Sequence, residues 1–166
     1  MDEKRQMLRH FLAALAYRTQ KALRGAPSSF AEFSAGNRVR TPHDVVHHMD
    51  DVLGYALTYF RGGRYRAVKL DDFSDQVASF HRKLEALAEE IGKGSPFRDT
   101  TPEQMLQGPF ADAMTHVGQL AMLRRLSGSP VAPENFIVAD VRAENLGPEQ
   151  PAPVSPDKVW PEAPES

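Results

Sequence analysis

The sequence predicts an all-α protein, an antiparallel four-helix bundle followed by a proline-rich C-terminal tail. Apolar residues recur at helical spacing in four separate stretches, and clusters of glycine and proline divide those stretches. No region is rich in strand-forming patterns. Four amphipathic helices with mostly short connections bury their apolar faces as an antiparallel bundle. The chain of 166 residues suits one bundle domain over 1–130, with a C-terminal extension over 131–166.

The first two predicted helices span about 3–24 and 42–61, and both have clear ends. A Gly-Ala-Pro sequence stops the first helix. The second begins at a capping signature in which Thr41 precedes Pro42 and Asp44, and a pair of glycines ends it. The apolar side of the first helix consists of Leu8, Phe11, Leu12, Leu15, Ala22 and Leu23. The apolar stripe of the second consists of Val45, His48, Val52, Tyr55 and Tyr59.

The third predicted helix spans about 72–92 and has an almost strict apolar seam, as bundle helices do. The fourth region opens with a second capping signature at Thr101. Gly108-Pro109 interrupts it, and the main helix is expected over about 109–127. The seam of the third helix consists of Phe73, Val77, Phe80, Leu84, Leu87 and Ile91.

The segment after Gly128 differs in character, because eight of the 13 prolines of the chain fall there. Proline at this density prevents regular structure. We therefore expect the tail to lie over the bundle in its first part, burying Phe136, Ile137 and Val138, and to fray toward Ser166.

Composition and charge exclude several classes of function. The formal net charge is -2, from 20 basic and 22 acidic residues, so no concentrated basic face for nucleic acid is expected. The absence of cysteine excludes disulfides, thiolate metal sites and a cysteine nucleophile. The charged N-terminus predicts neither a signal peptide nor a membrane span. A cytoplasmic protein with a small-molecule substrate, and without nucleic-acid or membrane partners, is expected.

Two of the six histidines occupy positions that indicate metal binding. His48 lies in the apolar stripe of the second helix, whereas His47 is rotated by about 100° toward its polar side. His116 lies in the fourth helix, and Asp112 precedes it by one turn on the same face. Two imidazoles and a carboxylate suit zinc, nickel, iron or manganese, and they leave coordination positions open for water or substrate.

A structural interpretation of the same residues stands beside the metal hypothesis. A buried histidine is more often a hydrogen-bonded core residue than a ligand, so His48 can form a simple polar contact with Asp112 or Tyr55. We interpret Arg124 as part of a solvated helix end that the helix dipole favours. Three further histidines are expected at the surface or its boundary, without a role: His10, His43 and His81.

Two stretches of the chain resemble the DinB-like (YfiT-like) metal-binding bundles. Residues 41–52 resemble the second helix of that family, with His48 at the place of the family's histidine. Residues 111–128 resemble its last bundle helix, and His116 matches the histidine of its His-x-Gly-Gln-type signature. In helix order and spacing the resemblance covers about 1–147.

Within the second stretch, Gly118 and Gln119 match the residues after the signature histidine. Gly118 is expected to allow a close approach of helices. The chain departs from the family pattern at Asp112, where that pattern has a histidine. Aspartate also binds metal ions, so the resemblance implies a site with changed metal preference or affinity.

The resemblance implies a four-helix bundle, often a homodimer, that binds a divalent metal and in some members catalyses thiol S-transfer or hydrolysis. The corresponding hypothesis is a metal-dependent enzyme with the ion held by His48, Asp112 and His116. A low-molecular-weight thiol or a water would be activated in a cleft near Tyr55 and Gln119. No residue is assigned as catalytic. The alternative is a non-catalytic bundle that binds a small apolar ligand or a partner through the same cleft.

Overall fold

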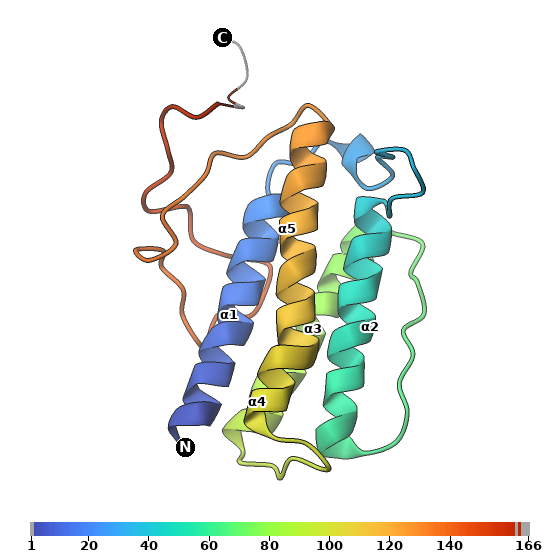
Figure 1. Ribbon diagram of the computed structural model, residues 1–166, viewed down its shortest axis with the longest axis vertical. Helices are drawn as coiled ribbons and strands as arrows, with labels where there is room; N and C mark the ends of the chain where they lie inside the picture. Colours follow the sequence, from blue (N-terminus) through green and yellow to red (C-terminus); the bar gives the residue numbers. More distant parts are fainter. Residues whose placement is uncertain (1, 162, 164–166) are drawn as a thin grey trace.

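The protein is a bundle of four long helices, as the sequence predicts (Figure 1). The computed structural model describes residues 2–161 and residue 163. Over those residues there is no strand, and one isolated antiparallel bridge joins Glu134 to Pro156. The elements are α1 (Glu3–Leu23), the 3-10 turn η1 (Ser28–Phe30), α2 (Pro42–Arg61), α3 (Phe73–Gly92), α4 (Pro102–Met105), the π-helical segment η2 (Leu106–Phe110) and α5 (Ala111–Leu126).

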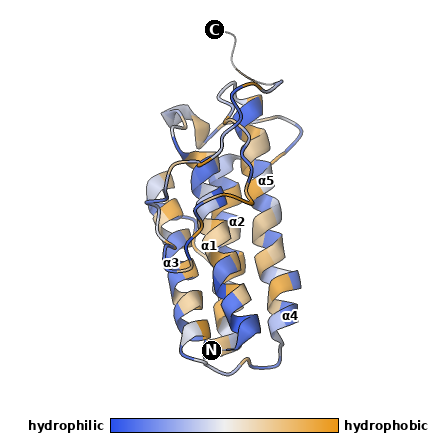
Figure 2. Cartoon of the chain, turned by 90° about the vertical axis from the view of Figure 1, so that its left-hand side faces the viewer, coloured by the Kyte–Doolittle hydropathy of each residue, from blue (hydrophilic) through white to orange (hydrophobic). Residues whose placement is uncertain are grey.

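The long helices form a closed arrangement in which each packs against two others. α5 lies between α1 and α2, and α3 lies behind them, against α1 and α2 (Figure 1). Each long helix has hydrophobic and hydrophilic residues around its circumference (Figure 2), and the apolar residues that face inward form one continuous core. None of the helices described has the length and apolar content needed to cross a bilayer.

The helix ends confirm the capping signatures read from the sequence. The Thr41 side chain accepts from the amide of Asp44, and the Asp44 side chain accepts from the amide of Thr41. Thr101 begins α4 with the same reciprocal pattern, and the Asp72 side chain caps α3. Each pair satisfies amide donors that a helix start otherwise leaves without partners. The long helices accordingly begin and end within two residues of their predicted limits, apart from the segment around Gly108-Pro109.

The apolar stripe predicted for α2 is wrong in its helical phase. Tyr55 is exposed, and His48, Val52 and Tyr59 are only partly buried. Histidine and tyrosine tolerate a boundary position because each has an apolar ring and a polar atom, so they do not mark the core. His48 therefore lies at the edge of the core, in contact with α5. The core side of α2 consists of Val45, Val46, Met49, Leu53, Ala56, Leu57 and Phe60.

Two histidines expected at the surface are buried. The Nδ1 of His81 donates to the carbonyl oxygen of Leu146 at 2.6 Å, and its Nε2 lies 2.8 Å from Nε2 of Gln20. Burial lowers the pKa of His81 below its usual value. His43 is held by Oε1 of Glu32 at 3.0 Å. These polar partners, two of them distant in sequence, make burial possible, and sequence pattern alone does not reveal them.

Arg124 is also buried, which corrects its interpretation as a solvated helix end. Its guanidinium donates to the carbonyl oxygens of Ala22 at 2.9 Å, Arg24 at 3.1 Å and Ser129 at 2.7 Å. The last carbonyls of a helix have no partner within it. Arg124 therefore ties the end of α1 to the end of α5.

The tail runs across the side of the bundle formed by α1 and α3 (Figures 1 and 2). Leu146 is buried against the core, and Glu134 accepts a hydrogen bond from Tyr17. The expected burial of 136–138 is wrong in part, because Ile137 is 93% exposed and Val138 is 48% exposed. The amide of Val138 donates to the carbonyl of Asn135, which closes a turn that faces solvent. The expected fraying at Ser166 lies outside the described residues.

Two substitutions test which apolar residues of the tail pack against the bundle. We expect Leu146→Ala to lower the free energy of unfolding by about 2–5 kcal/mol, because it removes a side chain packed into the core. Ile137→Ala is the matched control and is expected to change it by less than about 0.5 kcal/mol, because its side chain is exposed. Urea denaturation of both variants measures the difference. Equal stabilities would contradict docking through Leu146.

Candidate metal centre

The three residues predicted to bind a metal lie together in the structure. His48 comes from α2, and Asp112 and His116 come from one face of the neighbouring helix α5. The Nε2 of His48 lies 3.6 Å from Oδ2 of Asp112, and the Nε2 of His116 lies 3.5 Å from Oδ1. The imidazole rings are perpendicular, with centroids 4.6 Å apart. The grouping could hold a metal ion, because one ligand atom of each residue lies within 4.8 Å of the others.

A local change of helix geometry precedes these ligands on α5. Pro109 has no amide hydrogen, and proline disfavours helical backbone at the residue before it. Gly108 accordingly has φ -88° and ψ -105°, and residues 106–110 form a π-helical segment. Such segments are frequent at functional sites. Asp112 follows in the first turn of α5, so this irregular segment sets the direction in which α5 presents its carboxylate.

The spacing of the donor atoms is compatible with one bound ion. Atoms bound to one tetrahedral zinc at about 2.0–2.1 Å lie about 3.4 Å apart. The two separations from Asp112 are 3.6 Å at Oδ2 and 3.5 Å at Oδ1. Both exceed the usual range for a hydrogen bond but lie within ion-pair distance, so the polar contact between His48 and Asp112 is also present. The widest separation, within 4.8 Å, has to shorten when an ion binds.

Gln119 contacts His116 at the ring nitrogen that does not face Asp112. Its Oε1 lies 2.8 Å from Nδ1 of His116, and an amide oxygen only accepts hydrogen bonds. The proton of a neutral His116 therefore sits on Nδ1, and Nε2 keeps its lone pair toward Asp112. A second partner of this kind fixes the orientation and tautomer of a metal-binding histidine. The predicted contact of Gln119 with a cofactor stays a prediction.

The site is closed toward the core and open toward solvent. The side chain of His116 is 9% exposed, that of His48 is 30% exposed and that of Asp112 is 47% exposed. Burial, and then the charges of Arg40 and His116, hold the pKa of His48 below its usual value. A neutral imidazole is the form that binds metal. The open side, next to Asp112, leaves room for a further ligand.

Tyr55, which the sequence placed in the cofactor cleft, lies farther along α2. It is seven residues from His48, which corresponds to about 10 Å along a helix axis. Its hydroxyl is hydrogen-bonded to that of Tyr59. The described contacts thus join Tyr55 to Tyr59, and a direct contact of Tyr55 with the candidate metal centre stays a prediction.

The sequence pattern missed a buried carboxylate on α2. Asp50 is enclosed, and it accepts from Oγ of Ser79 at 2.9 Å and from the hydroxyl of Tyr65 at 3.4 Å. Lys83 completes the group, with its Nζ 3.8 Å from the same carboxylate. The core side of α2 includes Met49, and Asp50 lies next to it in the buried part of the helix. A sequence analysis that identified this side of α2 as apolar would therefore have found Asp50. Its partners show that Asp50 joins α2 to α3 and to the loop between them.

Searches of protein-family models, curated proteins and solved structures found no match to this chain. The resemblance to the DinB-like bundles therefore stays a prediction that rests on residues 41–60 and 108–128.

Proposed function

We propose that this protein is a divalent-metal-binding helical bundle and a metal-dependent enzyme of the thiol-transferase or hydrolase type. The ion is held by His48, Asp112 and His116. The main observation in support is the spacing of their donor atoms, which leaves Asp112 3.6 and 3.5 Å from the two histidines. Zinc, nickel, iron and manganese all suit two imidazoles and a carboxylate.

The protein side chains prepare the site for this role. Gln119 holds the Nδ1 proton of His116, so that Nε2 is available as a ligand. Partial burial favours the neutral form of His48. The carboxylate of Asp112 contributes the one negative charge of the three ligands and borders the open side. When bound, a divalent ion supplies Lewis acidity that lowers the pKa of a coordinated thiol or water.

Two observations favour thiol transfer over hydrolysis. The chain has no cysteine, so a free low-molecular-weight thiol would meet no internal competitor for the metal. Hydrolysis also needs a general base, and two carboxylates of α2, those of Asp44 and Asp51, are engaged elsewhere. Asp44 caps its own helix and pairs with Lys69 at 2.6 Å. Asp51 accepts from the backbone amide of Ala67 at 2.6 Å.

An activity assay with matched variants tests this proposal. Metal-loaded protein is offered a panel of cellular thiols with a halogenated aromatic electrophile, and in parallel a panel of activated esters. We expect a thiol-dependent rate that rises with protein, needs the metal and disappears in His116→Ala. His10→Ala, which removes an exposed histidine of α1, is expected to keep the rate. Metal binding without any metal-dependent rate in either panel would favour the non-catalytic binding protein instead.

A further inference from the structure

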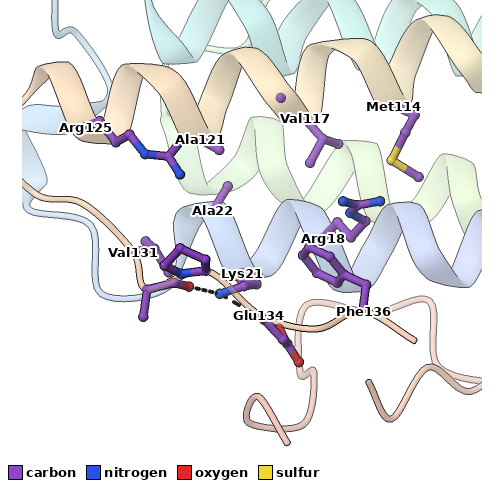
Figure 3. Close-up of a pocket in the computed structure, with 13 residues that line it drawn as sticks. Arg18, Lys21, Ala22, Met114, Val117, Ala121, Arg125, Val131, Glu134 and Phe136 are labelled. Atoms are coloured by element: carbon purple, nitrogen blue, oxygen red, sulfur yellow. Dashed lines mark hydrogen bonds and ion pairs between the residues drawn. The ribbon is translucent and has the colours of Figure 1, made fainter. Parts of the chain in front are cut away.

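A second pocket lies on the other side of α5, between α5, α1 and the first part of the tail (Figure 3). Its volume is about 280 Å³, near the lower limit for small-molecule sites. The metal ligands face α2, whereas the pocket residues of α5 face α1. Successive residues of a helix are rotated by about 100°, so Val117, Gly118 and Ala121 lie on the side of α5 opposite to Asp112.

The lining of this pocket combines an apolar floor with cationic side chains. Met114, Val117 and Ala121 form the floor on α5. Figure 3 shows the cationic side chains of Arg18, Lys21 and Arg125 around it. The one acid of the lining is Glu134, whose side chain is fully enclosed. Three cationic side chains and one enclosed carboxylate therefore line the pocket.

The carboxylate of Glu134 already has partners among its neighbours in the pocket wall. Its Oε1 accepts from the hydroxyl of Tyr17 at 2.6 Å, and its Oε2 lies 3.8 Å from Nζ of Lys21. Lys21 also donates to the carbonyl of Ala132 at 2.5 Å. These contacts hold the tail in place and use Glu134 and Lys21 together. Because the side chain of Glu134 has no exposed surface, its carboxylate does not contact an anion in the pocket directly.

Arg18, Lys21 and Arg125 are all partly exposed residues of the lining. The guanidinium of Arg18 lies 3.8 Å from the ring centroid of Phe136. Burial lowers the pKa of Arg18 in spite of the opposing charge of Glu134. An anion in the pocket would therefore relieve an incompletely compensated charge. A guanidinium binds a carboxylate through two parallel hydrogen bonds, so a carboxylate head group fits this position.

Gly118 keeps the floor open. A Cβ atom at this position would meet nothing within 4 Å, so the expected close approach of helices at Gly118 is not observed. The space beside Gly118 belongs to the pocket instead. We propose that the pocket binds a small amphipathic carboxylate, with its head group at Arg18 and its apolar chain over Val117 and Gly118.

Binding of octanoate to the full-length protein tests this proposal by calorimetry. Octanol and octylamine have the same chain with a neutral and a cationic head group. We expect saturable binding of octanoate at one site, at least about tenfold tighter than either control. The three compounds share one chain, and only octanoate can accept a charge-assisted hydrogen bond from Arg18. Equal binding of the three compounds, or no saturable binding of octanoate, would overturn the proposal.

Variants locate the binding site. Gly118→Leu fills the pocket and is expected to weaken octanoate binding about tenfold or more, whereas Gly118→Ala adds only one methyl group and is expected to retain most of it. Arg18→Met is expected to remove the preference for octanoate over octanol, since it keeps the apolar stem and loses the charge. Unchanged octanoate binding in both Gly118→Leu and Arg18→Met would place the ligand elsewhere and refute the proposal.

The metal centre provides an independent control. His116→Ala is expected to bind octanoate like the wild type, because the pocket lies on the other side of α5. The outcome of this test therefore does not depend on whether the candidate metal centre binds an ion. Loss of octanoate binding in a folded His116→Ala variant would show that the ligand sits at the metal centre, which contradicts the proposal.

Discussion

A divalent metal is expected to raise the melting temperature of the wild-type protein, and His116→Ala and His48→Ala are expected to abolish that rise. An ion that binds only the folded chain adds about 2.7 kcal/mol of stability when its free concentration is 100 times the dissociation constant. Each variant removes one of two nitrogen ligands from a three-residue site. Thermal denaturation with zinc, nickel, iron(II) and manganese, followed by circular dichroism, measures the shift.

Two further variants make the result specific. His47→Ala removes the neighbouring histidine, which is not part of the grouping, and is expected to keep the metal-dependent shift. Asp112→His introduces the residue type of the DinB-like pattern and is expected to strengthen zinc and nickel binding, since imidazole is the softer ligand. A shift that is lost in His47→Ala and kept in His48→Ala would contradict the assignment of ligands.

Gly54→Ala is expected to destabilise the protein by about 1–3 kcal/mol, although alanine is the better helix former. Gly54 is buried in the middle of α2, and a Cβ there would lie 1.9 Å from Cε1 of Tyr65. The ring has to move, which removes its packing on α2 and its contact with buried Asp50. Chemical denaturation measures the cost.

Gly118→Ala is the matched control in another helix. Its Cβ would meet nothing within 4 Å, so we expect a gain of about 0.5–1 kcal/mol from helix propensity alone. A double-mutant cycle identifies the cause of the difference. In a Tyr65→Ala background, Gly54→Ala is expected to stabilise the protein, as Gly118→Ala does. If Gly54→Ala remains destabilising there, the clash with Tyr65 is not the reason.

The helix limits were predictable because their signals are local. Thr41 and Thr101 begin their helices through contacts within three residues, and glycine or proline ends each helix nearby. The pairing of Asp112 with His116 was predictable for the same reason, because a spacing of four residues places both on one face of α5. His48 does belong to the grouping with Asp112 and His116, as predicted. The prediction, however, rested on an apolar stripe of α2 that is wrong in its helical phase.

The helical phase of α2 was less predictable. Its sequence allows two apolar stripes, and the tyrosines at 55 and 59 favoured the wrong one although both tolerate exposure. A site at the α2 and α5 boundary needs a ligand at the edge of the core, which is where His48 lies.

Features that depend on distant partners gave no sequence signal. Arg124 reaches carbonyls about 100 positions away, and Glu134 reaches Tyr17 at a separation of 117 residues. Buried charges become acceptable through such contacts, which depend on how the tail folds back over the bundle. The pocket of Arg18 and Gly118 is of the same kind, because the tail forms one of its walls.

The metal content of protein produced without a histidine tag tests the candidate metal centre most directly. The protein is loaded with each divalent metal, dialysed exhaustively and analysed by mass spectrometry for metals. We predict one ion per chain in the wild type and essentially none in the folded His48→Ala/His116→Ala double variant. Substoichiometric metal in the wild type with every ion, or the same content in the double variant, would contradict the assignment of His48, Asp112 and His116 as a metal centre.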